Sequence, residues 1–163
     1  MKRKIISLQV LLLCLFFPIT VCSQTAYAYL EDGVLTFKYG NRPNTGCDWE
    51  IPEHAYSPIG WYGKDIYEVE FDPSFAAARP TTLNGWFQNC TALWRITGLQ
   101  YLNTSQVTNM ASMFYNCPLL TEIDLRPLDT RNVTDMSYMF SGCSKLKRLD
   151  FSRFMTENLT KLV

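Results

Sequence analysis

The sequence has little of what most catalytic sites require. Among its 163 residues there is a single histidine, His54, which lies in the Pro-containing segment 51–58. Neither a G-x-S-x-G motif nor a cysteine–histidine context accompanies it, and no Gly-rich phosphate-binding loop is present. We therefore predict that the chain is not an enzyme and binds no cofactor.

An excess of positive charge is also absent. Fifteen Lys and Arg residues balance fifteen Asp and Glu residues, and three of the basic residues but none of the acidic ones lie in residues 1–23. Without that segment the net charge is about −3 at neutral pH. This balance argues against a nucleic acid or an anionic membrane as the partner.

Long apolar runs are scarce, with one exception near the start of the chain. Residues 5–17 are apolar and follow three basic residues. A segment with small residues, typical of a signal-peptidase cleavage region, comes next and ends at Ser23. This order is typical of an export signal, so we predict a signal peptide over residues 1–23. A lipid anchor on Cys22 is the less favoured alternative. In both cases the chain is expected to be secreted or held at the cell surface, with no transmembrane segment.

What the sequence does contain is an internal repeat of about 26 residues. Residues 133–154, VTDMSYMFSGCSKLKRLDFSRF, match residues 107–128, VTNMASMFYNCPLLTEIDLRPL. A less similar copy, with Leu83, Trp86, Phe87 and Cys90 at the corresponding positions, precedes them, and an incomplete fourth unit begins at Phe154. Such self-similarity is typical of a solenoid, in which each unit needs a neighbour to bury its apolar face. We therefore predict a repeat solenoid over residues 65–163.

Each unit combines two periodicities. Met110, Met113, Phe114 and Cys117 are spaced at i, i+3, i+4 and i+7, which predicts a short helix facing inward. Asn89, Asn116 and Gly142 precede the cysteines and suit a left-handed turn at the helix end. The apolar–polar alternation that follows each cysteine predicts one short strand per unit. The predicted fold class is α/β, a leucine-rich-repeat-like solenoid of strand-turn-helix units.

The N-terminal part of the mature chain has a different pattern. Residues 26–39, AYAYLEDGVLTFKY, form two β-rich runs around Asp32-Gly33, which is a tight-turn signal. We predict a β-hairpin that covers the open end of the solenoid and, with the Pro- and Gly-rich loop that follows, occupies residues 24–64.

These segments resemble a known family. FDPSFAAARPTTLNGWFQNC, ITGLQYLNTSQVTNMASMF and IDLRPLDTRNVTDMSYMFSGC are similar to the repeats of the BspA-like leucine-rich-repeat surface proteins, and the hairpin segment resembles the one that precedes them. The resemblance implies a bacterial surface protein with a right-handed α/β solenoid, an adhesin-like or protein-binding role and no catalytic residues. A structural spacer, or a fragment of a longer surface protein with no ligand of its own, is the alternative.

Charged residues recur at two positions of the predicted strands that face away from the core. The candidate contacts for another protein, a host-matrix or envelope component, are Glu68, Glu70, Arg95, Glu122, Asp124, Arg148 and Asp150. Opposite charges on neighbouring strands are mildly favourable, so alternating signs predict a ladder that keeps register. For Asp124 and Asp150 we favour hydrogen bonds to the N–H groups of the following turn. A weak Ca²⁺ or basic-ligand contact is the alternative.

Cysteine and asparagine also recur with the repeat. Cys90, Cys117 and Cys143 should form a column about 5 Å apart, which a disulfide would allow, but we favour free buried thiols. A linear column cannot surround a zinc ion, so we predict no metal site. Cys47 has no obvious mate. The four Asn-x-Ser/Thr sequons, at Asn89, Asn103, Asn132 and Asn158, are interpreted as turn residues rather than glycan sites.

The incomplete fourth unit predicts an apolar end. The Met136, Met139 and Phe140 side chains have only part of a neighbouring unit to pack against. We expect either that the chain is a fragment or that this end is a docking surface, with end-to-end self-association as one form of it.

Overall fold

The computed structural model describes residues 24–42, 48–51 and 60–162, and five strands lie in these residues. The predicted signal peptide, Cys22, Cys47 and His54 therefore fall outside the described residues. The strands are β1 (Thr25–Glu31), β2 (Val34–Gly40), β3 (Asp48–Glu50), β4 (Glu68–Phe71) and β5 (Arg95–Thr97), with short 3-10 helices at Pro73–Ala77 and Leu99–Tyr101. No helix in these residues is long and apolar enough to span a bilayer.

The predicted hairpin is present and forms part of a larger sheet. β1 and β2 pair antiparallel across a turn in which Asp32 and Gly33 both have positive φ (48° and 79°), as a tight hairpin turn requires. β3 pairs antiparallel with β1, whereas β2–β4 and β4–β5 are parallel. The result is one mixed sheet in the order β3-β1-β2-β4-β5. β3 lies where the sequence predicted only loop.

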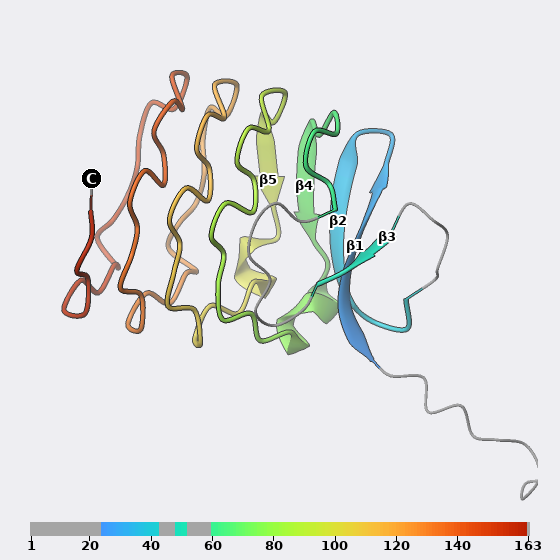
Figure 1. Cartoon of the computed structure of the whole chain (residues 1–163), viewed down its shortest axis with the longest axis horizontal. Helices are drawn as coiled ribbons and strands as arrows, with labels where there is room; N and C mark the ends of the chain where they lie inside the picture. The colour runs from blue at the N-terminus through green and yellow to red at the C-terminus, as the bar shows by residue number, and fades with distance from the viewer. Residues whose placement is uncertain (1–23, 43–47, 52–59, 163) are drawn as a thin grey trace, which may run out of the picture.

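Beyond β5 the chain continues as coils that lie side by side along the long axis of the molecule (Figure 1). There, turns replace regular strands. Isolated parallel bridges join neighbouring coils at Thr82↔Asn109, Asn109↔Asp135 and Asp135↔Lys161, and the first of them starts in the segment between β4 and β5. The described residues contain no α-helix. The predicted α/β class, a leucine-rich-repeat-like solenoid of strand-turn-helix units, is therefore wrong, and the protein is a mainly β structure built on a mixed sheet.

Backbone hydrogen bonding explains why the helices do not form. Where a helix was predicted, the N–H groups of Ser112, Phe114 and Asn116 donate to carbonyls of the next coil, those of Ser137, Met139 and Ser141, at 2.7–2.9 Å. An α-helix would use the same groups for bonds within the coil. Two residues per coil have a left-handed backbone, which a helix cannot contain: Gly85 and Asn89, Ser112 and Asn116, Tyr138 and Gly142. Tight turns thus place the i, i+3, i+4, i+7 side chains on one inward side.

One apolar core runs through the sheet and the coils. Phe37 of β2 is fully buried and stacks on Phe71 of β4, with ring centroids 4.7 Å apart. Further along, Phe87 stacks on Phe114 at 5.5 Å, and Phe114 stacks on Phe140 at 5.4 Å. The predicted packing of repeat side chains against one another is therefore seen without the predicted helices.

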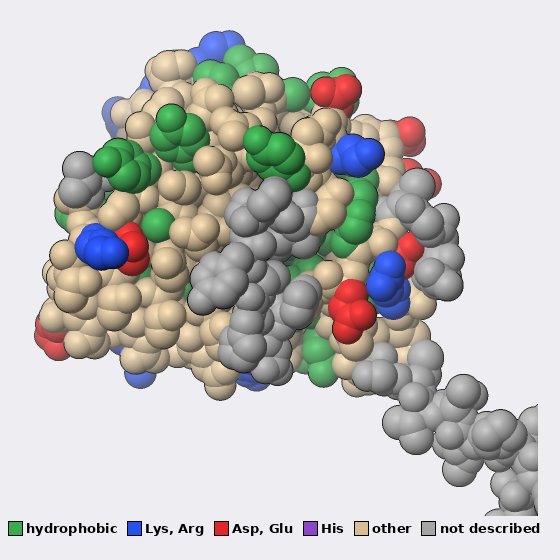
Figure 2. Space-filling view, viewed as in Figure 1, with side chains coloured by type: hydrophobic (Ala, Val, Ile, Leu, Met, Phe, Trp, Pro, Cys, Tyr) green, Lys and Arg blue, Asp and Glu red, His purple; other side chains and the backbone are tan. Residues whose placement is uncertain are grey.

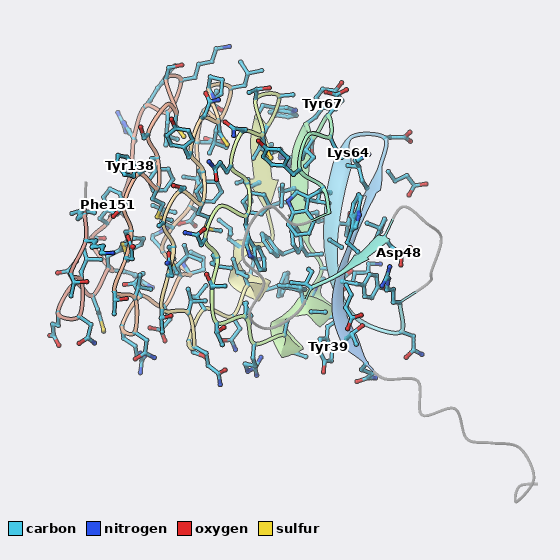
Figure 3. All side chains as sticks on the ribbon, viewed as in Figure 1. Tyr39, Asp48, Lys64, Tyr67, Tyr138 and Phe151 are labelled. Carbon is cyan, nitrogen blue, oxygen red and sulfur yellow. The ribbon has the colours of Figure 1, made fainter. Side chains whose placement is uncertain are left out.

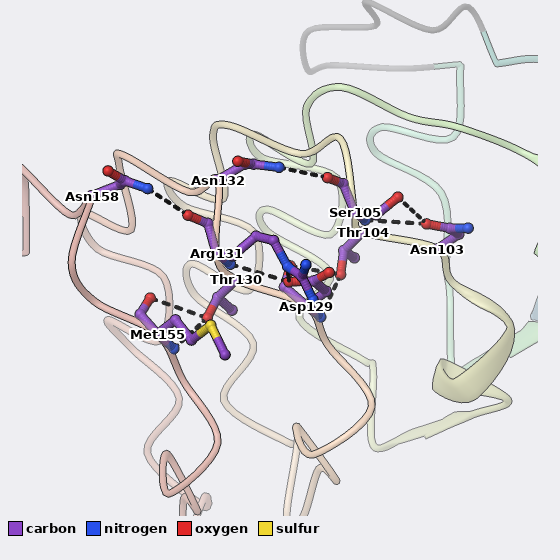
Figure 4. A network of polar contacts seen from close by, with 9 residues as sticks. All are labelled: Asn103, Thr104, Ser105, Asp129, Thr130, Arg131, Asn132, Met155 and Asn158. Atoms are coloured by element: carbon purple, nitrogen blue, oxygen red, sulfur yellow. Dashed lines mark hydrogen bonds and ion pairs between the residues drawn. The ribbon is translucent and has the colours of Figure 1, made fainter.

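A polar ladder joins the coils along one side (Figure 4). The buried Thr104 hydroxyl donates to the Asp129 carbonyl at 2.9 Å and accepts from the Asp129 N–H at 2.7 Å. Thr130 makes the same pair of bonds with Met155, one coil further on. The recurring threonines thus satisfy backbone groups where one coil turns into the next, which keeps the coils in register.

Candidate binding surface

The predicted outward charges of β4 and β5 lie side by side. Glu68 pairs with Arg95 and Glu70 with Thr97 in the parallel register, as the repeat spacing predicted. An Arg95 guanidinium nitrogen lies 3.7 Å from a Glu68 carboxylate oxygen, and both side chains are partly exposed. An ion pair this open to solvent contributes little to stability. It can therefore be exchanged for contacts with a charged partner at small cost.

Two aromatic side chains border this ion pair. The Tyr67 residue is 48% exposed and Trp94 is 46% exposed. The backbone N–H of Trp94 donates to the backbone carbonyl of Tyr67 at 3.0 Å. The Arg95 guanidinium carbon lies 5.9 Å from the Trp94 ring centre, within the range of a cation–π contact. The Tyr67 side chain lies beside the end of the β1–β2 hairpin (Figure 3). We call Tyr67, Glu68, Trp94 and Arg95 the β4–β5 patch.

The sequence analysis missed the two aromatic members of this patch. Their signal is present in the repeat, because Tyr67 and Trp94 occupy equivalent places directly before the aligned Glu68 and Arg95. Both rings are about half exposed, and each directly precedes its strand, Tyr67 before β4 and Trp94 before β5.

The remaining predicted contacts lie on the coils that follow β5. Glu122, Asp124, Arg148 and Asp150 are all exposed, although no regular strand carries them. Asp124 accepts hydrogen bonds from two Arg126 guanidinium nitrogens at 2.8 Å and from the Arg126 backbone N–H at 3.1 Å. Asp150 accepts from the Ser152 backbone N–H at 2.9 Å. The prediction that these aspartates bond to the following turn is confirmed.

Charge compensation accompanies these bonds. The hydrogen bond from the Arg126 side chain is the main cause that lowers the pKa of Asp124 to about 2. Hydrogen bonding with Ser152 lowers the pKa of Asp150, and the Arg126 charge acts in the same direction. Arg126 thus offsets the repulsion between two aspartates one coil apart. Among the described residues, no cluster of three or more His, Cys, Asp or Glu side chains is arranged to hold a metal ion.

The cysteine column is structural. Cys90, Cys117 and Cys143 are free thiols, as predicted. The Cys117 Sγ contacts the Phe87 carbonyl at 3.1 Å, and the Cys143 Sγ contacts the Phe114 carbonyl at 3.0 Å. Burial raises the pKa of Cys90 to about 12 and also raises that of Cys117. Thiols held protonated in this way are poor nucleophiles.

Three of the sequon asparagines form hydrogen bonds with backbone groups, and the fourth bonds a side chain of the next coil. Asn132 Nδ2 donates to the Ser105 carbonyl at 2.8 Å, and Asn158 Nδ2 donates to the Arg131 carbonyl at 2.7 Å. Asn103 accepts from the Ser105 N–H, and Asn89 accepts from the Asn116 side chain. The Asn103 bond is local, as the interpretation as a turn residue requires, whereas the bonds of the other three asparagines join neighbouring coils.

Charged side chains lie mostly around the margin of the face shown in Figure 2, with hydrophobic side chains scattered over its upper part. The β4–β5 patch differs from such scattered residues because Glu68 and Arg95 are paired across β4 and β5 and the two aromatic residues directly precede them. It offers stacking surface, a positive charge and a negative charge to one ligand.

Comparison with known proteins gives one family assignment. Residues 81–163, just over half of the chain, match the family described as "Mycoplasma protein of unknown function, DUF285". No curated protein and no solved structure matches the chain.

Proposed function

The chain belongs to the DUF285 family of Mycoplasma proteins of unknown function, and from that premise we propose that it is a protein-binding, adhesin-like module of the BspA-like surface type. The β4–β5 patch is the proposed contact site. Its partner is another protein, such as a host-matrix or envelope component. We further propose that the chain is exported through residues 1–23 and has no catalytic activity.

The observation that carries this proposal is the exposure of Tyr67 and Trp94 beside the Glu68–Arg95 ion pair. Aromatic and arginine side chains contribute most to the affinity of protein interfaces. Both residues directly precede the paired strands β4 and β5, and their backbones are joined by a hydrogen bond, so ordering the two rings on binding costs little entropy. The other predicted contacts, Glu70, Glu122, Asp124, Arg148 and Asp150, would form a charged rim.

A structural spacer is the second candidate, and the polar ladder supports it. The Thr104, Thr130 and Asn132 side chains are used to join coils. Most recurring residues are explained by such contacts without any ligand. The β4–β5 patch is the feature that a spacer leaves unexplained.

A binding comparison separates the two candidates. The full chain, immobilised on a biosensor, is exposed to a host extracellular-matrix protein preparation and to a preparation of envelope proteins. A binder gives saturable binding that Trp94→Ala weakens at least tenfold. Tyr115→Ala is the matched control, because Tyr115 is an exposed aromatic residue outside the patch, and it should bind like the wild type.

Thermal unfolding of both variants checks that neither substitution weakens binding by destabilising the fold. Since each side chain is more than a third exposed, both variants should unfold close to the wild-type temperature. Equal binding by Trp94→Ala and the wild type would contradict the assignment of the site. The absence of binding to either preparation would favour the spacer.

A further inference from the structure

An open groove between two neighbouring turns is lined by three arginines. The turns over residues 126–131 and 152–155 form its two walls, and its volume is about 560 Å³. Arg126, Arg131 and Arg153 line it together with Pro127 and Met155. Acidic residues outnumber basic ones over residues 24–163, so this concentration of positive charge runs against the balance of the chain. We call this feature the arginine groove.

Hydrogen bonds between the two turns hold the walls of the arginine groove together (Figure 4). The Thr130 hydroxyl accepts from the Met155 N–H at 2.8 Å and donates to the Met155 carbonyl at 3.2 Å. Asn158 Nδ2 donates to the Arg131 carbonyl at 2.7 Å. The separation of the walls is therefore set before a ligand arrives, which lowers the entropy cost of binding.

The stacking of coils does not require these arginines. The residues 26 positions earlier in the repeat are uncharged: Gln100 for Arg126, Ser105 for Arg131 and Pro127 for Arg153. The coil that carries Gln100 and Ser105 stacks on its neighbours through the same threonine bonds. The three arginines are thus an addition to the repeat, and the fold alone does not account for them.

The charges around the groove leave a positive excess. Arg126 pairs with Asp124 at 2.8 Å and Arg131 pairs with Asp129 at 2.9 Å. Both arginine side chains are at least 60% exposed, so these ion pairs are weak and can rearrange around a ligand. Among the described residues Arg153 forms no ion pair. Three positive charges therefore face two negative ones.

This arrangement favours a compact anion over a long polyanion. Guanidinium groups present planar sets of N–H donors that match the oxygens of phosphate and related oxyanions. Asp124 and Asp150 are exposed and lie near Arg126, whose charge lowers the pKa of both carboxyls. A polyanion that extends beyond the groove would be repelled by these two aspartates. Pro127 and Met155 offer apolar contact to the organic part of a small ligand.

We propose that the arginine groove binds the phosphate or sulfate group of an organic ester. This site is separate from the β4–β5 patch. Trp94 directly precedes β5, whereas Arg126 is the repeat equivalent of Gln100, in the 3-10 helix Leu99–Tyr101 that follows β5. The proposal therefore does not depend on the protein-binding function of that patch.

Phenyl phosphate and phenyl sulfate test the proposal when each is titrated into the full ¹⁵N-labelled chain. We expect saturable one-to-one binding of at least one ester, with amide shifts confined to residues 126–131 and 152–155. The ester that binds more tightly identifies the oxyanion. Inorganic phosphate and inorganic sulfate should each bind more weakly than the corresponding ester, because they make no contact with the apolar part of the wall.

Two variants place the binding in the groove. Arg153→Gln should weaken ester binding at least tenfold. Lys147→Gln is the matched control, because it removes an exposed positive charge outside the groove, and it should bind like the wild type. Urea unfolding of both variants should match that of the wild type, since neither side chain is buried.

Three results would overturn the proposal. The first is the absence of saturable binding by either ester. The second is an equal loss of binding in Arg153→Gln and Lys147→Gln, which would show general attraction to positive charge. The third is that the inorganic anions bind as tightly as the esters, which would show that the apolar wall makes no contact with a ligand.

Discussion

Gly98 shows how closely neighbouring coils approach. It has φ of +75°, and a β-carbon added there would lie 2.2 Å from the Phe71 carbonyl oxygen. Gly63 has almost the same φ, +74°, but a β-carbon there would meet no atom within 4 Å. The two glycines therefore separate the effect of backbone conformation from the effect of close packing.

This pair leads to a stability prediction. Gly63→Ala should lower the free energy of unfolding by about 1–2 kcal/mol, the typical cost of a left-handed backbone for a residue with a side chain. Gly98→Ala should lower it by more, because β4 and the coil must also move apart. Urea denaturation of both variants measures the difference, and equal losses would contradict the close approach.

Some left-handed positions could be predicted from residue type and others could not. Asn89, Asn116 and Gly142 are left-handed as the sequence indicated, with φ of 61°, 56° and 81°. Ser112 and Tyr138 are also left-handed, although serine and tyrosine carry no such signal. The cross-coil hydrogen bonds of Ser112 fix its conformation, and a single sequence does not reveal bonds between coils.

At the scale of elements, one spacing had two structural solutions. The i, i+3, i+4, i+7 pattern places Met110, Met113, Phe114 and Cys117 on one side of a helix, but a series of tight turns buries the same four side chains. β1, β2 and β4 were predictable because their composition is β-rich over several residues, but the strands predicted after Cys117 and Cys143 do not form. β3 has only three residues, and its pairing with β1 depends on distant contacts.

The phenylalanine stack gives the prediction at this scale. Phe114 is fully buried between Phe87 and Phe140, so Phe114→Ala should lower the free energy of unfolding by about 3–5 kcal/mol. Phe140→Ala is the matched control, because this ring is only partly buried and should cost clearly less. Denaturant unfolding of both variants tests the order. A larger loss for Phe140→Ala would mean that the C-terminal coil anchors the core.

At the scale of the whole molecule, the sheet and the coils form one body. β2 of the hairpin pairs directly with β4, and Phe37 of β2 contacts Phe71 and Trp86. The repeat predicted the side-by-side placement of units and the Glu68–Arg95 pairing. The repeat did not predict the exposure of Tyr67 and Trp94. Periodicity indicates which side of a strand faces the core, but it does not indicate how far along the chain the core covers that side.

The central claim is that successive coils are joined by backbone hydrogen bonds between repeats rather than built from helices. NMR scalar couplings across hydrogen bonds test it directly on the labelled chain. The account predicts couplings from the Ser112, Phe114 and Asn116 amides to the carbonyls of Ser137, Met139 and Ser141. Couplings from Phe114 to Met110, four residues earlier in the same coil, would show an α-helix and contradict the account.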